Sequence, residues 1–148
     1  MNDARLILMV GLPRSGKTTR ANKLSRDLNA PIVNPDAIRR VVCGQTYHQR
    51  SEPLIWGIAK TMVMSLFEAG HPVVILDACS HTRARRDDWK SAHWKPEFQV
   101  VTTPTSICRQ RVVDCGSDPN LLAVIDRMAA SYEPPKEDEG KVISTAGF

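Results

Sequence analysis

Short apolar runs alternate along this chain with longer stretches in which apolar residues recur every three or four positions. Residues 5–10 and 72–77 are continuous apolar runs, as expected for strands that are covered on both faces. Weaker strand candidates lie at 31–34, at 99–102 and near Val142. Because helical patterns separate these runs, the sequence predicts a three-layer α/β fold, with a mostly parallel central sheet and helices on both faces.

Helical patterns follow most of the strand candidates. The expected helices lie at 17–28, 35–43, 54–69, 106–114 and 120–132, with a further one just after Asp77. The third helix has a wide apolar stripe that should pack on the sheet, formed by Leu54, Ile55, Ile58, Met62, Val63, Leu66 and Phe67. Residues 44–52 are expected to form a mobile loop, and residues 134–140 an exposed connection.

Length, composition and charge limit the classes to which this protein can belong. With 148 residues, 42% hydrophobic and 24% charged, the chain is expected to form one globular domain, 1–148. The apolar runs are far shorter than a membrane span and the N-terminus lacks signal-peptide character, which predicts a cytoplasmic protein without a membrane partner. The four cysteines lack C-x-x-C spacing, so no structural zinc is expected. A net charge of +4 suits a phosphate-bearing partner without identifying it.

One motif carries most of the chemistry. The sequence GLPRSGKT at 11–18 matches the phosphate-binding pattern G-x-x-x-x-G-K-[ST], directly after a predicted strand and opening a predicted helix. Such a loop aims backbone N–H groups and a helix N-terminus at phosphate. We therefore expect ATP as a ligand, with Lys17 on its β- and γ-phosphates and Thr18 as a ligand of Mg²⁺. The nucleotide-binding residues predicted here are Gly11, Leu12, Pro13, Arg14, Ser15, Gly16, Lys17, Thr18 and Thr19.

Two carboxylates follow strand candidates. Asp77 ends the run 72–77, where a carboxylate can hold Mg²⁺ directly or through water, although polar residues also end ordinary strands. Asp36 follows the second strand candidate at the same edge of the sheet, where it can accept the proton of an acceptor hydroxyl. Two structural roles compete with catalysis at Asp36, namely capping of the helix 35–43 and an ion pair with Arg39.

Arginines and aromatic residues add further candidates. A two-helix lid over about 105–127 would carry cations toward ATP, the candidates being Arg109, Arg111 and Arg127. A second group is expected to form a solvated helix face, with acceptor contact as the alternative: Arg83, Arg85 and Arg86. The tryptophans are expected to be packing residues, with Tyr47 as a candidate for stacking on a base.

Four segments together give most of the chain a resemblance to the kinase domain of phage-type polynucleotide 5′-kinases, and more broadly to zeta-toxin-like and small-molecule kinases on an AAA-type P-loop domain. These segments are 11–18, Asn34-Pro-Asp36-Ala-Ile-Arg39, Val74-Ile-Leu-Asp77 and Ile125-Asp-Arg127-Met128. The resemblance implies the P-loop NTPase fold, Asp36 as general base, and Arg39 as a contact to an acceptor phosphate. It also implies a second lid arginine four residues after the first, where Cys115 follows Arg111 instead.

The resemblance favours an ATP-dependent kinase that phosphorylates the 5′-hydroxyl of DNA or RNA, with Lys17, Asp36 and Arg39 as catalytic residues. The first alternative is a kinase for a nucleoside, sugar or antibiotic, and the second is an ATP-binding switch that is not a kinase. A nucleic-acid acceptor calls for a groove lined by basic residues, among them Arg39, Arg40, Arg50 and the cations of 83–86, whereas a small acceptor calls for a closed pocket. A switch needs no acceptor base.

Overall fold

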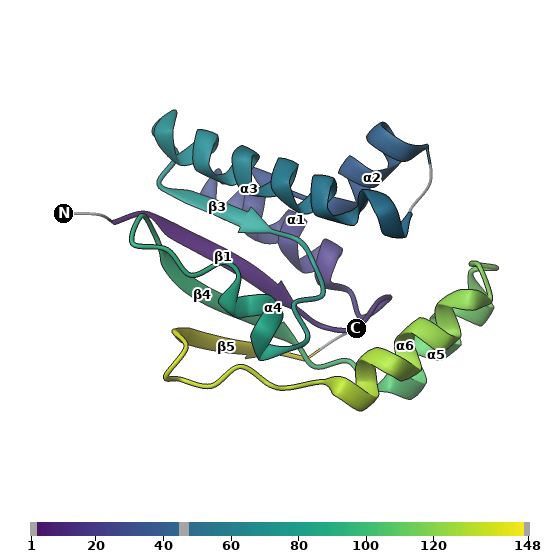
Figure 1. Ribbon diagram of the computed structural model, residues 1–148. Coiled ribbons are helices and arrows are strands. Elements are labelled where there is room, and N and C mark those ends of the chain that lie inside the picture. Colours follow the sequence, from purple (N-terminus) through teal and green to yellow (C-terminus); the bar gives the residue numbers. More distant parts are fainter. Residues whose placement is uncertain (1–2, 45–47, 147–148) are drawn as a thin grey trace.

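A parallel sheet forms the centre of the molecule in the computed structural model, which describes residues 3–44 and 48–146 (Figure 1). In that part of the chain the strand order is β2-β3-β1-β4-β5, and every pairing between neighbours is parallel. Each strand candidate is confirmed, although β4 begins at Lys95 rather than at 99 because polar residues obscure its start. The strand bounds are β1 Arg5–Val10, β2 Ile32–Val33, β3 Val73–Leu76, β4 Lys95–Val101 and β5 Lys141–Thr145.

The helices also lie where the sequence predicts them. Their bounds are α1 Lys17–Leu28, α2 Pro35–Cys43, α3 Glu52–Glu68, α4 Arg83–Asp87, α5 Thr105–Asp114 and α6 Asn120–Ser131. The segment expected to be a loop contains the short 3-10 helix Gln49–Ser51, and its last residue, Glu52, already begins α3. Tyr47 lies outside the described residues, so its proposed stacking on a base stays a prediction. No helix among the described residues is long and apolar enough to cross a membrane.

The central strand β1 shows why this sequence gives a three-layer fold. Leu6 and Leu8 belong to a core shared with α2 and α3, whereas Ile7 and Met9 belong to a second core that includes residues of α1. All four side chains are fully buried, and burial of each contributes about 1.5–3 kcal/mol. A strand with helices on both faces must be apolar at every position, which explains the continuous run. The predicted α/β fold class is confirmed.

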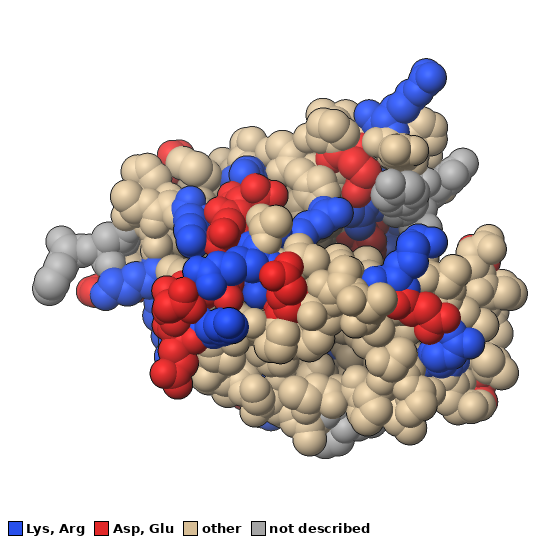
Figure 2. Space-filling view, turned by 60° about the horizontal axis from the view of Figure 1, so that its bottom comes forward, with Lys and Arg blue, Asp and Glu red and all other residues tan. Residues whose placement is uncertain are grey.

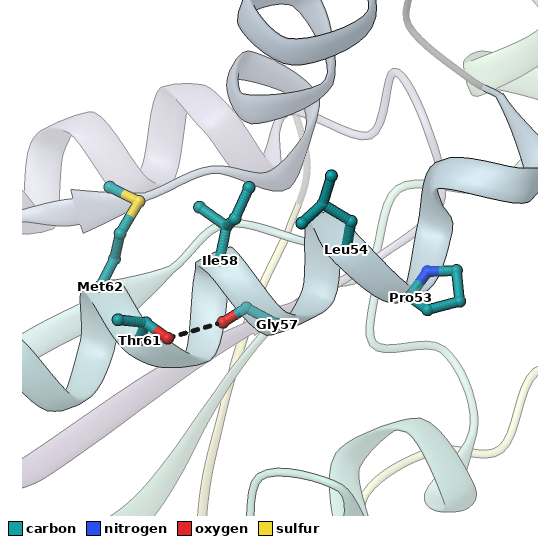
Figure 3. Close-up of a pocket in the computed structure, with 6 residues that line it drawn as sticks. All are labelled: Pro53, Leu54, Gly57, Ile58, Thr61 and Met62. Atoms are coloured by element: carbon teal, nitrogen blue, oxygen red, sulfur yellow. Dashed lines mark hydrogen bonds between the residues drawn. The ribbon is translucent and has the colours of Figure 1, made fainter.

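The apolar stripe of α3 packs on the sheet only in part. Ile55, Ala59 and Val63 are fully buried, but Leu54 is 55% exposed and Met62 is 38% exposed. Figure 3 shows Leu54, Ile58 and Met62 projecting to one side of α3, where they line an open groove of about 470 Å³. The predicted stripe was too wide because one helix can turn only about a third of its surface to a flat sheet.

The region after β3 corrects one further prediction. The sequence predicts a solvated helix face for Arg86, yet Arg86 is 2% exposed. Residues 134–140 form the exposed connection that the sequence predicts, apart from buried Pro135 and Glu139 and half-buried Gly140. Arg86 Nε donates to Glu139 Oε1 at 2.9 Å, and Arg86 Nη1 donates to the Ser80 carbonyl at 2.9 Å. Burial alone would raise the pKa of Glu139, but the hydrogen bonds from Arg86 and from the Lys136 N–H outweigh it and hold the pKa below its ordinary value. The tryptophan prediction is confirmed, since Trp89 and Trp94 are buried in the core.

Helices α5 and α6 form a pair beyond the carboxyl ends of the strands (Figure 1). They have a small core of their own, built from Cys108, Val112 and Ile125, and Leu12 of the phosphate loop packs against it. The pair therefore contacts the rest of the molecule beside the phosphate loop. This is the place that the sequence predicted for a lid.

Candidate active site

All parallel strands end at one edge, so the segments that follow β1, β2 and β3 leave the sheet side by side. The phosphate loop 11–16 follows β1, Asp36 follows β2, and Asp77 follows β3. The chain thus brings together at this edge the three features that the sequence placed in the site. Ligands of open α/β sheets bind at this edge.

The phosphate loop turns sharply where its sequence predicts it. Arg14 and Gly16 have φ values of 65° and 97°, in the left-handed region. The Gly11 N–H donates to the Cys79 carbonyl at 3.1 Å, and a Cβ on Gly11 would lie 2.7 Å from Ser15 Oγ. A side chain at position 11 would therefore open the loop, which explains why its first residue is glycine.

The loop also has the donors that a phosphate would need. Helix α1 begins at Lys17 without a side-chain cap, so its first N–H groups stay available to an anion. Ser15 Oγ is buried and has no hydrogen-bond partner among the described residues. The loop backbone is held from outside, because Thr103 Oγ1 donates to the Ser15 carbonyl at 2.6 Å. These features fit the phosphates of a nucleotide, with Lys17 Nζ resting 3.4 Å from the Leu12 carbonyl at the loop's start.

Thr18 and Asp77 meet as predicted for a magnesium site. Thr18 Oγ1 donates to Asp77 Oδ2 at 2.8 Å, and Asp77 is only 5% exposed. A hydroxyl and a carboxylate in contact at the end of a phosphate loop are oxygen ligands of the kind that Mg²⁺ prefers. The donor set of this chain therefore fits Mg²⁺.

Sequence reasoning missed Asn34, which connects Asp77 to the start of α2. Asn34 Nδ2 donates to Asp77 Oδ2 at 3.4 Å, while its Oδ1 accepts from the N–H groups of Asp36 and Ala37. Asn34 is thus the N-cap of α2, a role that had been a competing explanation for Asp36. The signal was available in the sequence, since Asn before Pro at a helix start is a strong cap. With the cap supplied by Asn34, the carboxylate of Asp36 is not used for capping.

Asp36 and Arg39 pair as their spacing predicts, within a larger cluster. Arg39 Nη1 lies 2.5 Å from Asp36 Oδ1, and Arg39 also makes two hydrogen bonds to Glu52, at 2.9 and 2.8 Å. Its guanidinium lies 5.7 Å from the ring centre of Trp56. Burial alone would lower the pKa of Arg39, but Glu52 and Asp36 outweigh it and raise the pKa. Glu52, which sequence reasoning also missed, leaves Arg39 fewer donors for an acceptor phosphate.

The three arginines of the predicted lid have different surroundings. Arg111 Nη1 donates to the Arg14 carbonyl at 2.9 Å, which places this cation on the phosphate loop. Arg109 instead pairs with Asp126 of α6 at 2.5 Å, and Arg127 is exposed on α6. Cys115 is the exposed C-cap of α5, one turn beyond Arg111. The structure therefore brings one of the three predicted arginines to the phosphate loop.

Half of the basic residues expected to line a nucleic-acid groove are paired with carboxylates. Arg39 pairs with Asp36 and Glu52, Arg83 pairs with exposed Asp138 at 2.9 Å, and Arg86 pairs with buried Glu139. Figure 2 shows one face of the molecule, on which basic and acidic side chains lie in mixed groups instead of forming a continuous basic band. Each of these pairs reduces the positive potential that a polyanion would meet.

Comparison with solved structures agrees with this fold, while no curated protein matches the sequence. A sugar kinase from Janibacter sp. HTCC2649 is 20% identical with a TM-score of 0.72, covering 97% of this chain and 85% of that chain. A gluconokinase from Sinorhizobium meliloti 1021 is 17% identical with a TM-score of 0.64, covering 97% and 84%. A chain of the Pnkp1/Rnl/Hen1 RNA repair complex is 19% identical with a TM-score of 0.68, covering 91% of this chain and 49% of that longer one.

These likenesses concern the fold, which this chain shares with proteins described as kinases. The family comparison is more direct, since it rests on the sequence itself. The sequence matches the AAA domain family over residues 6–135, which include the phosphate loop, Asp36, Asp77 and the lid arginines, and the chain therefore belongs to the AAA domain family of P-loop proteins.

Proposed function

We propose that this protein is an ATP- and magnesium-dependent kinase that transfers the γ-phosphate to a hydroxyl group, with Asp36 as general base. The observation that carries the proposal is the carboxylate of Asp36, which is 61% exposed, oriented by Arg39, and located at the sheet edge that holds the phosphate loop. A carboxylate placed there can orient an acceptor hydroxyl and accept its proton. An ATP-binding switch has no use for such a group.

The other residues of the edge supply positioning and charge. Lys17 and the N–H groups at the start of α1 would hold the phosphates, and Arg111 on the neighbouring lid would add a second cation. Thr18 and Asp77 would hold Mg²⁺, which neutralises phosphate charge when bound. Phosphoryl transfer needs little from a protein beyond such positioning and charge stabilisation. The proton of the acceptor hydroxyl would pass to an oxygen of Asp36.

Two acceptor classes remain open to this chemistry. A DNA or RNA 5′-hydroxyl is supported by the Asp36–Arg39 spacing and by the fold shared with a chain of the RNA repair complex. A small-molecule hydroxyl is supported by the ion pairs that engage Arg39, Arg83 and Arg86, since these reduce the positive charge available to a polyanion. The charge distribution favours the small acceptor.

The test is transfer from γ-labelled ATP with Mg²⁺ to 5′-hydroxyl oligonucleotides, nucleosides, sugars and sugar acids. We expect labelled product from the wild type, and a fall in kcat of about 10²- to 10⁴-fold for Asp36→Asn, with ATP binding retained. Asp27→Asn is the matched control, because Asp27 is an exposed carboxylate that pairs with Lys23 on α1. Full activity of Asp36→Asn would exclude the general base, and ATP hydrolysis without any labelled acceptor would support the switch.

A further inference from the structure

A small pocket shares the ring of Trp56 with Arg39, the partner of Asp36. It has a volume of about 170 Å³ and is lined by Trp56, Lys60, Ser80, Arg85, Asp88 and Trp89. Trp56 and Lys60 come from α3, and the other four come from the segment around α4 that follows Asp77. The ring of Trp56 joins the pocket to the site, because the guanidinium groups of both Arg39 and Arg85 lie over it, at 5.7 and 5.6 Å from its centre.

The pocket holds two cations that are not used in ion pairs. Lys60 lies 5.7 Å from the ring centre of Trp89 and Arg85 lies over Trp56, and neither makes a salt bridge to a carboxylate within residues 3–44 and 48–146. Stacking on an aromatic ring positions a cation while leaving its N–H donors free for another partner. Asp88 is the carboxylate of the pocket, so its net charge is +1.

This arrangement contrasts with that of three arginines that have carboxylate partners. Arg39, Arg83 and Arg86 each have a carboxylate partner, whereas Lys60 and Arg85 are held by tryptophan rings. An anionic group entering the pocket would therefore meet two positioned donors without displacing an ion pair. The volume admits only a few heavy atoms, well below the 300–1,000 Å³ typical of sites that enclose whole ligands. The pocket is therefore large enough for one end of an acceptor molecule but not for the whole molecule.

We propose that Lys60 and Arg85 bind the anionic end of a small hydroxylated acceptor, a carboxylate or a phosphate, while a hydroxyl of the same molecule faces Asp36. This inference rests on the proposed kinase function and specifies its substrate class as an acidic polyol. Trp56 and Trp89 form the walls of the pocket and hold the two cations over their rings. Arg85 and Lys60 would then determine specificity, in place of Arg39.

The first experiment measures transfer kinetics of the full chain with three acceptors matched in length: ribitol, ribonate and ribitol 5-phosphate. The variants are Arg85→Gln and Lys60→Gln, with Lys90→Gln as control, because Lys90 is exposed and pairs with Asp87 outside the pocket. We expect each pocket variant to raise KM for the acidic acceptors by about tenfold to a hundredfold, as lost charged hydrogen bonds do, with KM for ATP unchanged. Ribonate and the phosphate ester distinguish the two anionic groups. Equal KM changes for ribitol and the acids would overturn the proposal.

A second measurement is independent of catalysis. Because Trp56 and Trp89 line the pocket, ribonate, ribitol 5-phosphate and ribitol are titrated against tryptophan fluorescence without ATP. We expect a saturable change with an acidic compound that Arg85→Gln weakens about tenfold or more, and no such change with ribitol. Binding without transfer would support the pocket and contradict the kinase. Transfer that is insensitive to Arg85→Gln and Lys60→Gln would support the kinase and contradict the pocket.

Discussion

Asn34 caps α2 and so leaves the carboxylate of Asp36 available for other contacts. The side-chain oxygen of Asn34 caps α2, and its side-chain NH₂ group donates to Asp77. One residue thus links the start of α2 to a proposed metal ligand. The remaining partner of Asp36 is Arg39, which Glu52 and Trp56 hold in place. Asp36 is mostly exposed, and a pair in water contributes at most about 1 kcal/mol, so an acceptor can reach the carboxylate at little cost.

The charge of Lys17 is expected to stabilise the phosphate during transfer. Lys17→Ala should lower kcat for phosphoryl transfer by roughly 10²- to 10³-fold, because the variant lacks the cation next to the phosphate loop. Initial rates with γ-labelled ATP measure the effect. Lys23→Ala is the control on the same helix, since Lys23 is exposed and pairs with Asp27. Similar rates for both variants and the wild type would contradict the proposed mechanism.

At the scale of elements, α4 is fixed to the segment between α6 and β5. The Arg86–Glu139 pair is buried, the Arg83–Asp138 pair lies at the surface, and the Glu133 N–H donates to the His81 carbonyl at 2.8 Å. These contacts hold in place the helix that carries Arg85. The chain needs them because α4 has only five residues and a helix of that length is not stable by itself.

The buried Arg86–Glu139 ion pair should contribute strongly to stability. Arg86→Met should lower the free energy of unfolding by about 3–5 kcal/mol, because it leaves the carboxylate of Glu139 buried without its partner. Chemical denaturation measures the loss. Arg83→Met, which breaks an exposed pair, should cost less than about 1 kcal/mol. Adding Glu139→Leu to Arg86→Met should recover much of the stability. If the double variant is as unstable as Arg86→Met alone, the unpaired carboxylate of Glu139 is not the cause of the loss.

The same pair predicts a dependence of stability on pH. Because the folded-state pKa of Glu139 is lowered from 4.5, its contribution is complete above about pH 4.5 and is lost as the pH falls through the folded value. Stability measured from pH 6 to pH 3 should therefore fall less steeply in Glu139→Gln than in the wild type. Parallel curves for the two proteins would show that the folded and unfolded pKa values of Glu139 are alike.

The whole molecule is organised around the phosphate loop. Leu12 packs on the core of α5 and α6, Thr103 holds the Ser15 carbonyl, and Arg111 holds the Arg14 carbonyl. The sheet, α1 and the proposed lid thus meet at one loop. A ligand that binds this loop should stabilise the fold as a whole.

Thermal unfolding tests that expectation. A nonhydrolysable ATP analogue with Mg²⁺, at about a hundred times its Kd, should raise the free energy of unfolding by about 2.7 kcal/mol. For a chain of this size this corresponds to a rise in Tm of roughly 5–10 °C. Arg111→Gln should reduce this gain in stability at the same ligand concentration, because it removes a cation that α5 holds against the phosphate loop. Adenosine is the control ligand, as it lacks the phosphates. The same shift with adenosine would place the binding energy outside the phosphate loop.

Local signals in the sequence were sufficient to predict the elements, their order and the phosphate loop. Continuous apolar runs, helical periodicity and the Gly11–Thr18 pattern are local properties, and each is tied to a local conformation. The sequence also placed Thr18 with Asp77, since segments that follow parallel strands meet at one edge of the sheet, and Asp36 with Arg39, since residues three apart on a helix are neighbours. The fold class followed from the same local signals.

Which charges are paired and which are free depends on contacts between segments that lie far apart in the sequence. Glu52 reaches Arg39 across 13 residues and Glu139 reaches Arg86 across 53, and local sequence indicates neither pair. The same holds for the pocket that Lys60 and Arg85 share, whose walls come from two separate segments. Electrostatic interactions depend on distance and burial in the folded molecule, and these are set by packing between elements rather than by the residues next to each charge.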